Sequence, residues 1–143
     1  MLRPALNEGV AALDEQANRQ VIQPEGEYWT IIYAGRTCRL RATNGVRYLA
    51  YLLGHPNQRV SAGVLEHGAE GVGGGPPVDE AAARAGRERS RVNVTRALTA
   101  TLTRIEEFHP ELGRHLRATL RTGAFCTYTP DPRVPTGWEI GSA

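Results

Sequence analysis

The chain has 143 residues, of which 41% are hydrophobic and 22% are charged, so it is long enough for one domain with a hydrophobic core. Its formal net charge of +2 does not by itself indicate a nucleic acid or an anionic membrane surface as a partner. No apolar run is long enough to cross a bilayer, and the first residues lack the apolar stretch of a signal peptide. These properties predict a cytoplasmic protein with no membrane partner.

The basic residues are unusual in kind and in distribution. All 17 are arginine, and the segment 28–65 contains several of them but no acidic residue. Arginine is well suited to paired contacts with phosphate groups and with base edges. A GC-rich genome would also favour arginine over lysine, so the bias has two explanations.

Residues 2–19 are expected to form a helix, with Pro4 in its first turn. Its apolar stripe consists of Leu6, Val10, Leu13 and Ala17. A helix with so short and small a stripe is not stable alone and has to pack on something. We therefore expect the segment 1–22 to pack against the main domain, residues 23–143, or to join two copies of the chain in a homodimer.

A β-hairpin is expected near the start of the main domain. Residues 23–27, which include Pro24 and Gly26, predict a turn-rich connector. The segments 28–33 and 36–41 then alternate and are rich in aromatic and β-branched residues, with a glycine between them.

Three helix starts follow from capping residues. Thr43 is placed to cap a helix that ends near Leu53, and Ser61 is placed to cap a short second helix. Residues 68–78 are rich in glycine and proline, which predicts a flexible surface loop. Asp79 is placed to cap an Ala/Arg-rich helix that leads into, or lies just before, the helix described next.

The segment 89–108 predicts a long helix with two contrasting faces. The apolar face consists of Val94, Leu98, Leu102 and Ile105 at helical spacing. The opposite face consists of Arg89, Asn93, Arg96, Thr99, Ala100 and Thr103, and no acidic residue lies between positions 88 and 106. Such a surface suits a polyanion. An ordinary amphipathic helix with a solvated face explains the same pattern.

The C-terminal part predicts a short helix and a second hairpin. Pro110 begins a helix through Leu116, and residues 120–128 alternate around Thr122 and Gly123. Trp138 and Ile140 are expected to add a last strand or to pack on the outside of this hairpin.

The order hairpin, helix, short helix, loop, long helix, hairpin resembles a winged helix-turn-helix domain of the OmpR/PhoB type. Residues 39–61 resemble that family's first helix and its link to the second, and residues 120–128 resemble its wing. A closer resemblance, over about residues 25–132, is to the C-terminal winged-helix-like module of actinobacterial ATPase-type and tetratricopeptide-type regulators. The shared blocks are Glu27-Tyr-Trp-Thr, Gly35-Arg-Thr, Leu40-Arg, Arg91-Val-Asn-Val-Thr-Arg-Ala97, Pro110-Glu-Leu-Gly-Arg-His-Leu116, Arg121-Thr-Gly123 and Tyr128.

This resemblance implies an α+β fold with an N-terminal β-hairpin, a three-helix core and a C-terminal wing hairpin, preceded here by the extra N-terminal helix. It also implies a nucleoid-associated transcriptional regulator that binds double-stranded DNA, with the helix 89–108 in the major groove and the wing near 120–128. Arg96 and Asn93 are expected at base edges. The expected phosphate or supporting contacts are Arg89, Thr99, Thr103, Arg121, Thr122, Arg41, Arg47, Arg59 and Ser61.

Simpler explanations exist for three of these features. Asn93 is also explained as a helix cap or turn residue, Arg96 as a solvated side chain, and the residues around Gly123 as a plain β-turn. Two further functional hypotheses stay open. One is a protein-interaction module that docks a regulatory partner. The other is a small-ligand or redox sensor that uses Cys38, Cys126 or a pocket between the N-terminal helix and the core. The scattered histidines and the two cysteines show no metal-ligand spacing, so an enzyme, a metal site or a cofactor is not expected.

Overall fold

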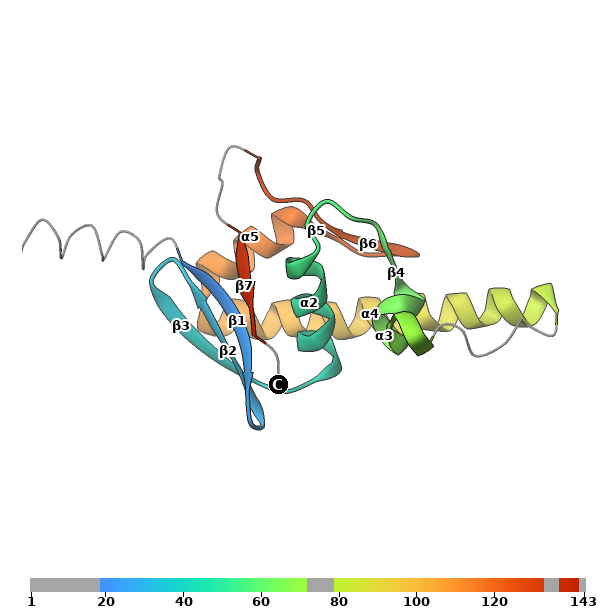
Figure 1. Ribbon diagram of the computed structural model, residues 1–143, viewed down its shortest axis with the longest axis horizontal. Helices are drawn as coiled ribbons and strands as arrows, with labels where there is room; N and C mark the ends of the chain where they lie inside the picture. The colour runs from blue at the N-terminus through green and yellow to red at the C-terminus, as the bar shows by residue number, and fades with distance from the viewer. Residues whose placement is uncertain (1–18, 72–78, 133–136, 142–143) are drawn as a thin grey trace, which may run out of the picture.

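The computed structural model describes residues 19–71, 79–132 and 137–141. Within these residues the chain is mixed α+β, with four helices, one four-stranded sheet and one three-stranded sheet (Figure 1). The expected α+β class is therefore confirmed. No described helix is both long enough and apolar enough to cross a membrane.

The four-stranded sheet forms one end of the molecule. It contains β1 (Gln20–Glu25), β2 (Tyr28–Tyr33), β3 (Arg36–Arg41) and β7 (Trp138–Ile140), in the order β3-β2-β1-β7. The hairpin expected over residues 28–41 is confirmed. Ala34 and Gly35 at its bend both have positive φ angles, 51° and 77°, as a tight two-residue hairpin turn requires.

The connector expected over residues 23–27 is wrong for its first three residues, which belong to β1 and pair with β2. Pro24 is tolerated in this strand because β7 pairs only with residues 20–22 of β1, so the other edge of β1 is open at Pro24. Residues 20–22, which the sequence assigns to the N-terminal segment, begin the same strand. The helix expected before them, with its dimer contact, lies outside the described residues.

The three helix caps are confirmed. In each case the side-chain oxygen accepts a hydrogen bond from the backbone N–H three residues further along. The distance is 3.3 Å for Thr43 at the start of α2 (Asn44–Gly54) and 3.1 Å for Ser61 at the start of α3 (Ala62–Gly71). It is 2.6 Å for Asp79 at the start of α4 (Glu80–Phe108).

The loop expected over residues 68–78 begins later than expected. The helix α3 continues to Gly71, because glycine weakens a helix by only about 1 kcal/mol and the first proline of this stretch is at position 76. Residues 72–78 lie outside the described part of the chain. The Ala/Arg-rich segment after Asp79 is continuous with the next helix, and together they form the 29 residues of α4.

The helix α4 runs along the longest axis of the molecule (Figure 1). The expected apolar stripe is confirmed, since Val94, Leu98 and Ile105 are completely buried and Leu102 is 7% exposed. Before Ser90 no residue of α4 is buried. The N-terminal third of the helix therefore extends beyond the helices that pack on its remainder.

A short helix and a second sheet complete the structure. The helix α5 (Pro110–Thr119) leads directly into the hairpin of β5 (Leu120–Arg121) and β6 (Phe125–Tyr128), as expected. The strand β6 also pairs with β4 (Val60–Ser61), which gives the sheet order β4-β6-β5. Trp138 and Ile140 do form a last strand, but it pairs in parallel with β1 and not with the second hairpin.

The His109 side chain connects α5 with the four-stranded sheet. It is 1% exposed and lies between α4 and α5. Its Nδ1 atom accepts a hydrogen bond from Leu112 N at 3.2 Å, which caps α5, and its Nε2 atom donates to the carbonyl oxygen of Tyr33 at 2.8 Å. One imidazole therefore connects the start of α5 with the end of β2.

We expect His109→Ala to lower the free energy of unfolding by roughly 2–4 kcal/mol, because it removes a helix cap and leaves the Tyr33 carbonyl without its donor. His109→Asn keeps a side-chain acceptor that can cap α5, so it should lower the free energy of unfolding by a smaller amount. Chemical denaturation of the three proteins measures both effects. A loss below about 0.5 kcal/mol for His109→Ala would contradict this role.

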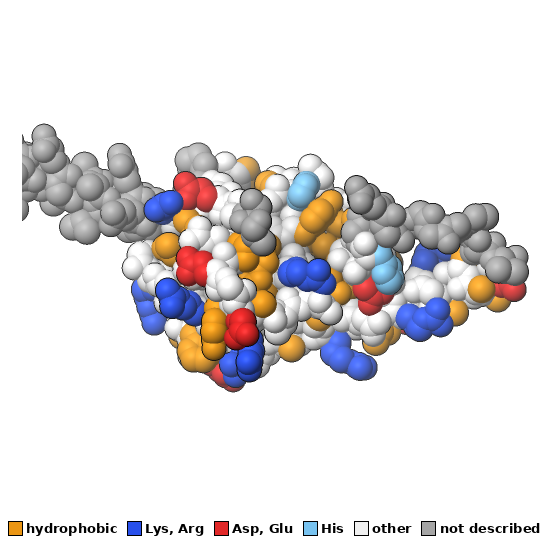
Figure 2. All heavy atoms as spheres, turned by 60° about the horizontal axis from the view of Figure 1, so that its bottom comes forward, with side chains coloured by type: hydrophobic (Ala, Val, Ile, Leu, Met, Phe, Trp, Pro, Cys, Tyr) orange, Lys and Arg blue, Asp and Glu red, His pale blue; other side chains and the backbone are white. Residues whose placement is uncertain are grey.

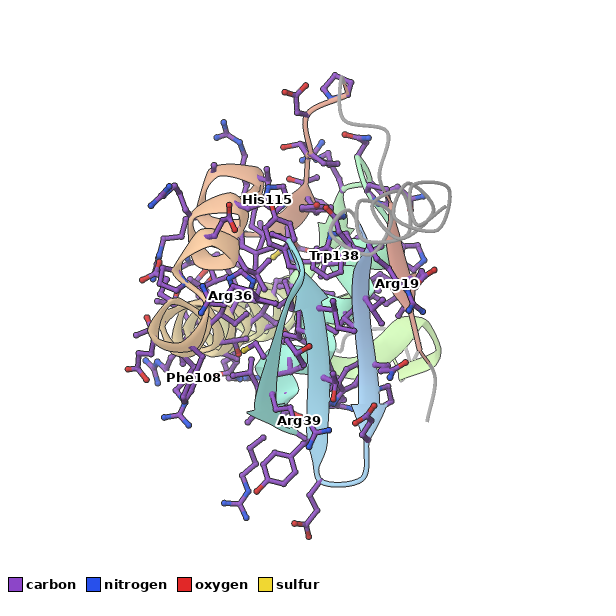
Figure 3. The ribbon with its side chains drawn as sticks, turned by 90° about the vertical axis from the view of Figure 1, so that its left-hand side faces the viewer. Arg19, Arg36, Arg39, Phe108, His115 and Trp138 are labelled. Atoms are coloured by element: carbon purple, nitrogen blue, oxygen red, sulfur yellow. The ribbon has the colours of Figure 1, made fainter. Side chains whose placement is uncertain are left out.

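An aromatic cluster ties α5 to both sheets. The Tyr128 hydroxyl accepts a hydrogen bond from Trp138 Nε1 at 3.0 Å and lies 2.9 Å from His115 Nε2. The Tyr33 ring stacks on His115 and on Trp138. Figure 3 shows His115 and Trp138 near one end of the four-stranded sheet. Burial lowers the pKa of the His115 imidazole, so the cluster favours its neutral form.

This lowered pKa predicts a loss of stability in acid. The unfolded chain binds the His115 proton more readily than the folded chain does, so stability is full above about pH 6.5 and declines below it. We expect His115→Gln to make the decline in unfolding free energy between about pH 7 and pH 5 shallower. Equal slopes in the variant and the natural protein, measured by denaturant unfolding, would refute this assignment.

Candidate nucleic-acid interface

Three of the expected DNA contacts share the outward face of α4. Arg89, Arg96 and Thr99 are all exposed, and they lie opposite the buried stripe. No hydrogen bond or ion pair of these three side chains exists within the described residues. Their donors are therefore free to reach a ligand.

Asn93 lies on the same face but already has a partner. Its Nδ2 atom donates a hydrogen bond to Glu66 of α3 at 2.9 Å, and the Ser90 hydroxyl donates to the other oxygen of the same carboxylate at 2.8 Å. His67 Nε2 lies 3.0 Å from this carboxylate as well. A base contact by Asn93 would need the bond to Glu66 to open.

The Glu66 carboxyl has a lowered pKa. Burial alone would raise it, but the hydrogen bonds from Asn93 and Ser90, together with His67, outweigh burial. Glu66 therefore stays ionised and joins α3 to α4. Its partners are 24 and 27 residues away in sequence, so the pattern of the long helix alone gave no sign of this contact.

Thr103 also has partners within the fold. Its hydroxyl donates to the Thr99 carbonyl oxygen at 3.0 Å and accepts from Arg117 Nη2 at 3.4 Å. Arg117 also forms a salt bridge with Glu106. The Thr103 hydroxyl is thus already engaged in hydrogen bonds, whereas the Arg96 guanidinium has no partner within the described residues.

The second hairpin carries two further candidate DNA contacts and has a third, Arg59, beside it. Arg121 and Thr122 are exposed at its turn, while the Arg59 guanidinium lies 4.4 Å from the centre of the Phe125 ring. Ser61, the remaining candidate here, accepts the Val64 N–H and so caps α3. The hairpin and the start of α3 are neighbours because β4 pairs with β6.

The start of α2 holds the last two candidates. Arg41 is exposed and has no hydrogen bond or salt bridge within the described residues. Arg47 Nη2 donates to Asn44 Oδ1 at 2.5 Å, so its guanidinium lies over the first turn of the helix. The structure thus spreads the predicted residues over α4, the hairpin and the start of α2.

The arginines do not form one continuous basic surface. Figure 2 shows the Arg side chains as separate groups, with acidic and hydrophobic side chains between them on the face in view. The segment of α4 between Glu88 and Glu106 has no acidic residue of its own. The positive surface is therefore local to this helix and is bordered by Glu66.

Both cysteines are buried free thiols. Burial raises the pKa of both the Cys38 and the Cys126 thiols, which favours their protonated form. The described residues contain no group of three or more side chains that could hold a metal ion.

No protein-family model, curated protein or solved structure significantly matches this chain.

The Glu66 contact predicts a stability effect. We expect Glu66→Gln to lower the free energy of unfolding by about 1–2 kcal/mol, because it removes charge-assisted hydrogen bonds between α3 and α4. Glu107→Gln is the control, since Glu107 meets Arg104 at 3.9 Å with both side chains more than half exposed. It should change stability by less than about 0.5 kcal/mol. Equal effects in urea unfolding would show that Glu66 is no more than a surface carboxylate.

Proposed function

We propose that the protein is a DNA-binding transcriptional regulator of the winged helix-turn-helix type. The observation that carries this proposal is the outward face of α4, where Arg89, Arg96 and Thr99 have free donors and no acidic residue of their own helix lies between Glu88 and Glu106. Arginine and threonine side chains on a helix of this kind suit phosphate and base contacts in a major groove.

The arrangement of the elements supports this function. The helix α4 packs on both α2 and α3, and a hairpin pairs with the short strand β4 that precedes α3. In a winged-helix domain α2 and α3 would be the first two helices, α4 the recognition helix, and β5–β6 the wing. In the order of the chain, α5 comes between α4 and the hairpin. This helix is an addition to the simplest winged-helix arrangement.

In this proposal Arg96 contacts a base edge and Arg89 and Thr99 contact phosphate. Arg121 and Thr122 at the hairpin turn would reach the next groove or its backbone. The N-terminus of α3, next to Ser61 and Arg59, would accept a phosphate. Homodimerisation through residues 1–22 would match a site with two half-sites.

A second candidate function is a protein-interaction module, and one observation favours it. A shallow hollow lies along the flank of α4 and is lined by Arg91, Val92, Thr95, Arg96, Thr99 and Ala100. The Thr95 hydroxyl in this hollow is buried without a hydrogen-bond partner in the described part of the structure. A docked protein segment could supply that partner.

Anisotropy titrations with fluorescent duplexes selected from a random-sequence library test the DNA proposal. We expect the logarithm of the affinity to fall linearly with the logarithm of the salt concentration. Arg96→Ala should weaken binding to the selected sequence roughly 5- to 150-fold, because it removes a base contact of about 1–3 kcal/mol.

Arg87→Ala is the matched control. Arg87 is on the same helix, two residues before Arg89 and so on the other side, and it forms a salt bridge with Glu80 at 3.3 Å. It should bind DNA as the natural protein does. Binding that is absent, or that is lost equally in both variants, would overturn the proposal and favour the protein-interaction module.

A further inference from the structure

We propose that the hollow between the end of β3, the start of α2 and the middle of α4 binds a small molecule with an apolar body and a carboxylate group. This proposal does not rest on DNA binding. The hollow has a volume of about 390 Å³, within the range of small-molecule sites. Its residues include Leu40, Arg41, Gly45, Ala100, Thr101 and Arg104.

Small residues allow α2 and α4 to approach closely beside this hollow. A Cβ atom on Gly45 would lie 2.1 Å from Thr101 Oγ1 and 2.5 Å from the Ala97 carbonyl oxygen, so only glycine fits at this position. Ala97 and Ala100, which also line the hollow, have side chains too short to fill it. The hollow is therefore built into the packing of two helices and not into a loop.

The Thr101 hydroxyl is the first sign of a ligand. The residue is only 5% exposed and lines the hollow, yet its side chain has no hydrogen bond within the described residues. A hydroxyl that lines a hollow without a protein partner has to be satisfied by water or by a ligand. A ligand oxygen in the hollow would do so.

The charge around the hollow indicates that the ligand is an anion. The N–H groups of Asn44 and Gly45 are the first two of α2, and such groups have no acceptor within their own helix. Together with the helix dipole they favour a negative charge. Arg41 and Arg104 add two positive charges.

No acidic residue lines the hollow to balance these charges. The salt bridge from Arg104 to Glu107, at 3.9 Å between exposed groups, is weak. The Arg104 guanidinium also lies over the exposed Phe108 ring, 5.5 Å from its centre, a contact that contributes little at an exposed site. It can therefore turn to a ligand at small cost.

The residues that line the hollow indicate the chemical character of the remainder of the ligand. Leu40, Val46, Ala97 and Ala100 present mainly carbon atoms, which favour an apolar body over a bare inorganic ion. A single anionic group can contact the N–H groups in the first turn of α2 and both arginines. A carboxylate on an aryl or alkyl chain has both properties, and a phosphate ion has only one.

Amide chemical shifts of the full chain, recorded in ¹H–¹⁵N spectra, test this proposal. The probes are 3-phenylpropionate, its neutral amide 3-phenylpropanamide, and inorganic phosphate. We expect saturable shifts of the Asn44 and Gly45 amides with 3-phenylpropionate, and at least about tenfold weaker binding of the other two probes. No saturable shift, or equal binding of the neutral amide or of phosphate, would overturn the proposal.

Two variants of α4 sharpen the test without disturbing the fold. Thr101→Val keeps the shape and removes the hydroxyl, so it should weaken binding of 3-phenylpropionate roughly three- to tenfold. Thr95→Val removes another unpartnered hydroxyl from the same helix, outside the hollow, and should leave the affinity unchanged. Unchanged affinity in Thr101→Val, or an equal loss in both variants, would refute the role of Thr101. Unaltered spectra away from the site show that each variant is folded.

Discussion

The burial of one side of α4 is the interaction on which the rest of the structure depends. The helices α2, α3 and α5 and the strand β3 all pack against this one helix. Val94, Leu98 and Ile105 are completely shielded from water there. Each such side chain contributes about 1.5–3 kcal/mol when it is fully buried, so this stripe makes a large contribution to holding the neighbours of α4 in place.

This packing also decides which parts of α4 can meet a ligand. The buried stripe turns Arg89, Arg96 and Thr99 outward, while α5 takes up the C-terminal part of the same face through Thr103 and Arg117. On the flank, α3 introduces Glu66 and its hydrogen bonds to Ser90 and Asn93. The available cationic surface is thus narrower than the helical pattern alone suggests.

Local features of the fold could be predicted from the sequence. The hairpin over residues 28–41 and the caps at Thr43, Ser61 and Asp79 are confirmed, because turns and caps depend on residues a few positions apart. The apolar stripe of α4 is confirmed for the same reason.

Contacts between distant residues could not be predicted in this way. The strand β1 was missed because Pro24 and Gly26 suggest a turn, and only its partners β2 and β7 make the extended conformation favourable. The hydrogen bond between Glu66 and Asn93 joins two residues that are 27 positions apart on different helices, and nothing in the periodicity of either helix indicates it. The helix that carries the candidate residues could therefore be predicted, but the accessibility of the individual residues could not be derived.

The two proposed functions of α4, DNA binding at its outward face and carboxylate binding in the hollow, would weaken each other. Ala100 borders both the outward face near Arg96 and the hollow beside Arg104, so the two surfaces adjoin on one helix. A carboxylate held by Arg41, Arg104 and the start of α2 would reduce the positive potential that a polyanion meets at this helix. By linkage, DNA bound at the outward face would weaken the carboxylate ligand by the same factor. No movement of the backbone is needed for this coupling, because the repulsion between two negatively charged ligands at neighbouring sites of one helix is sufficient.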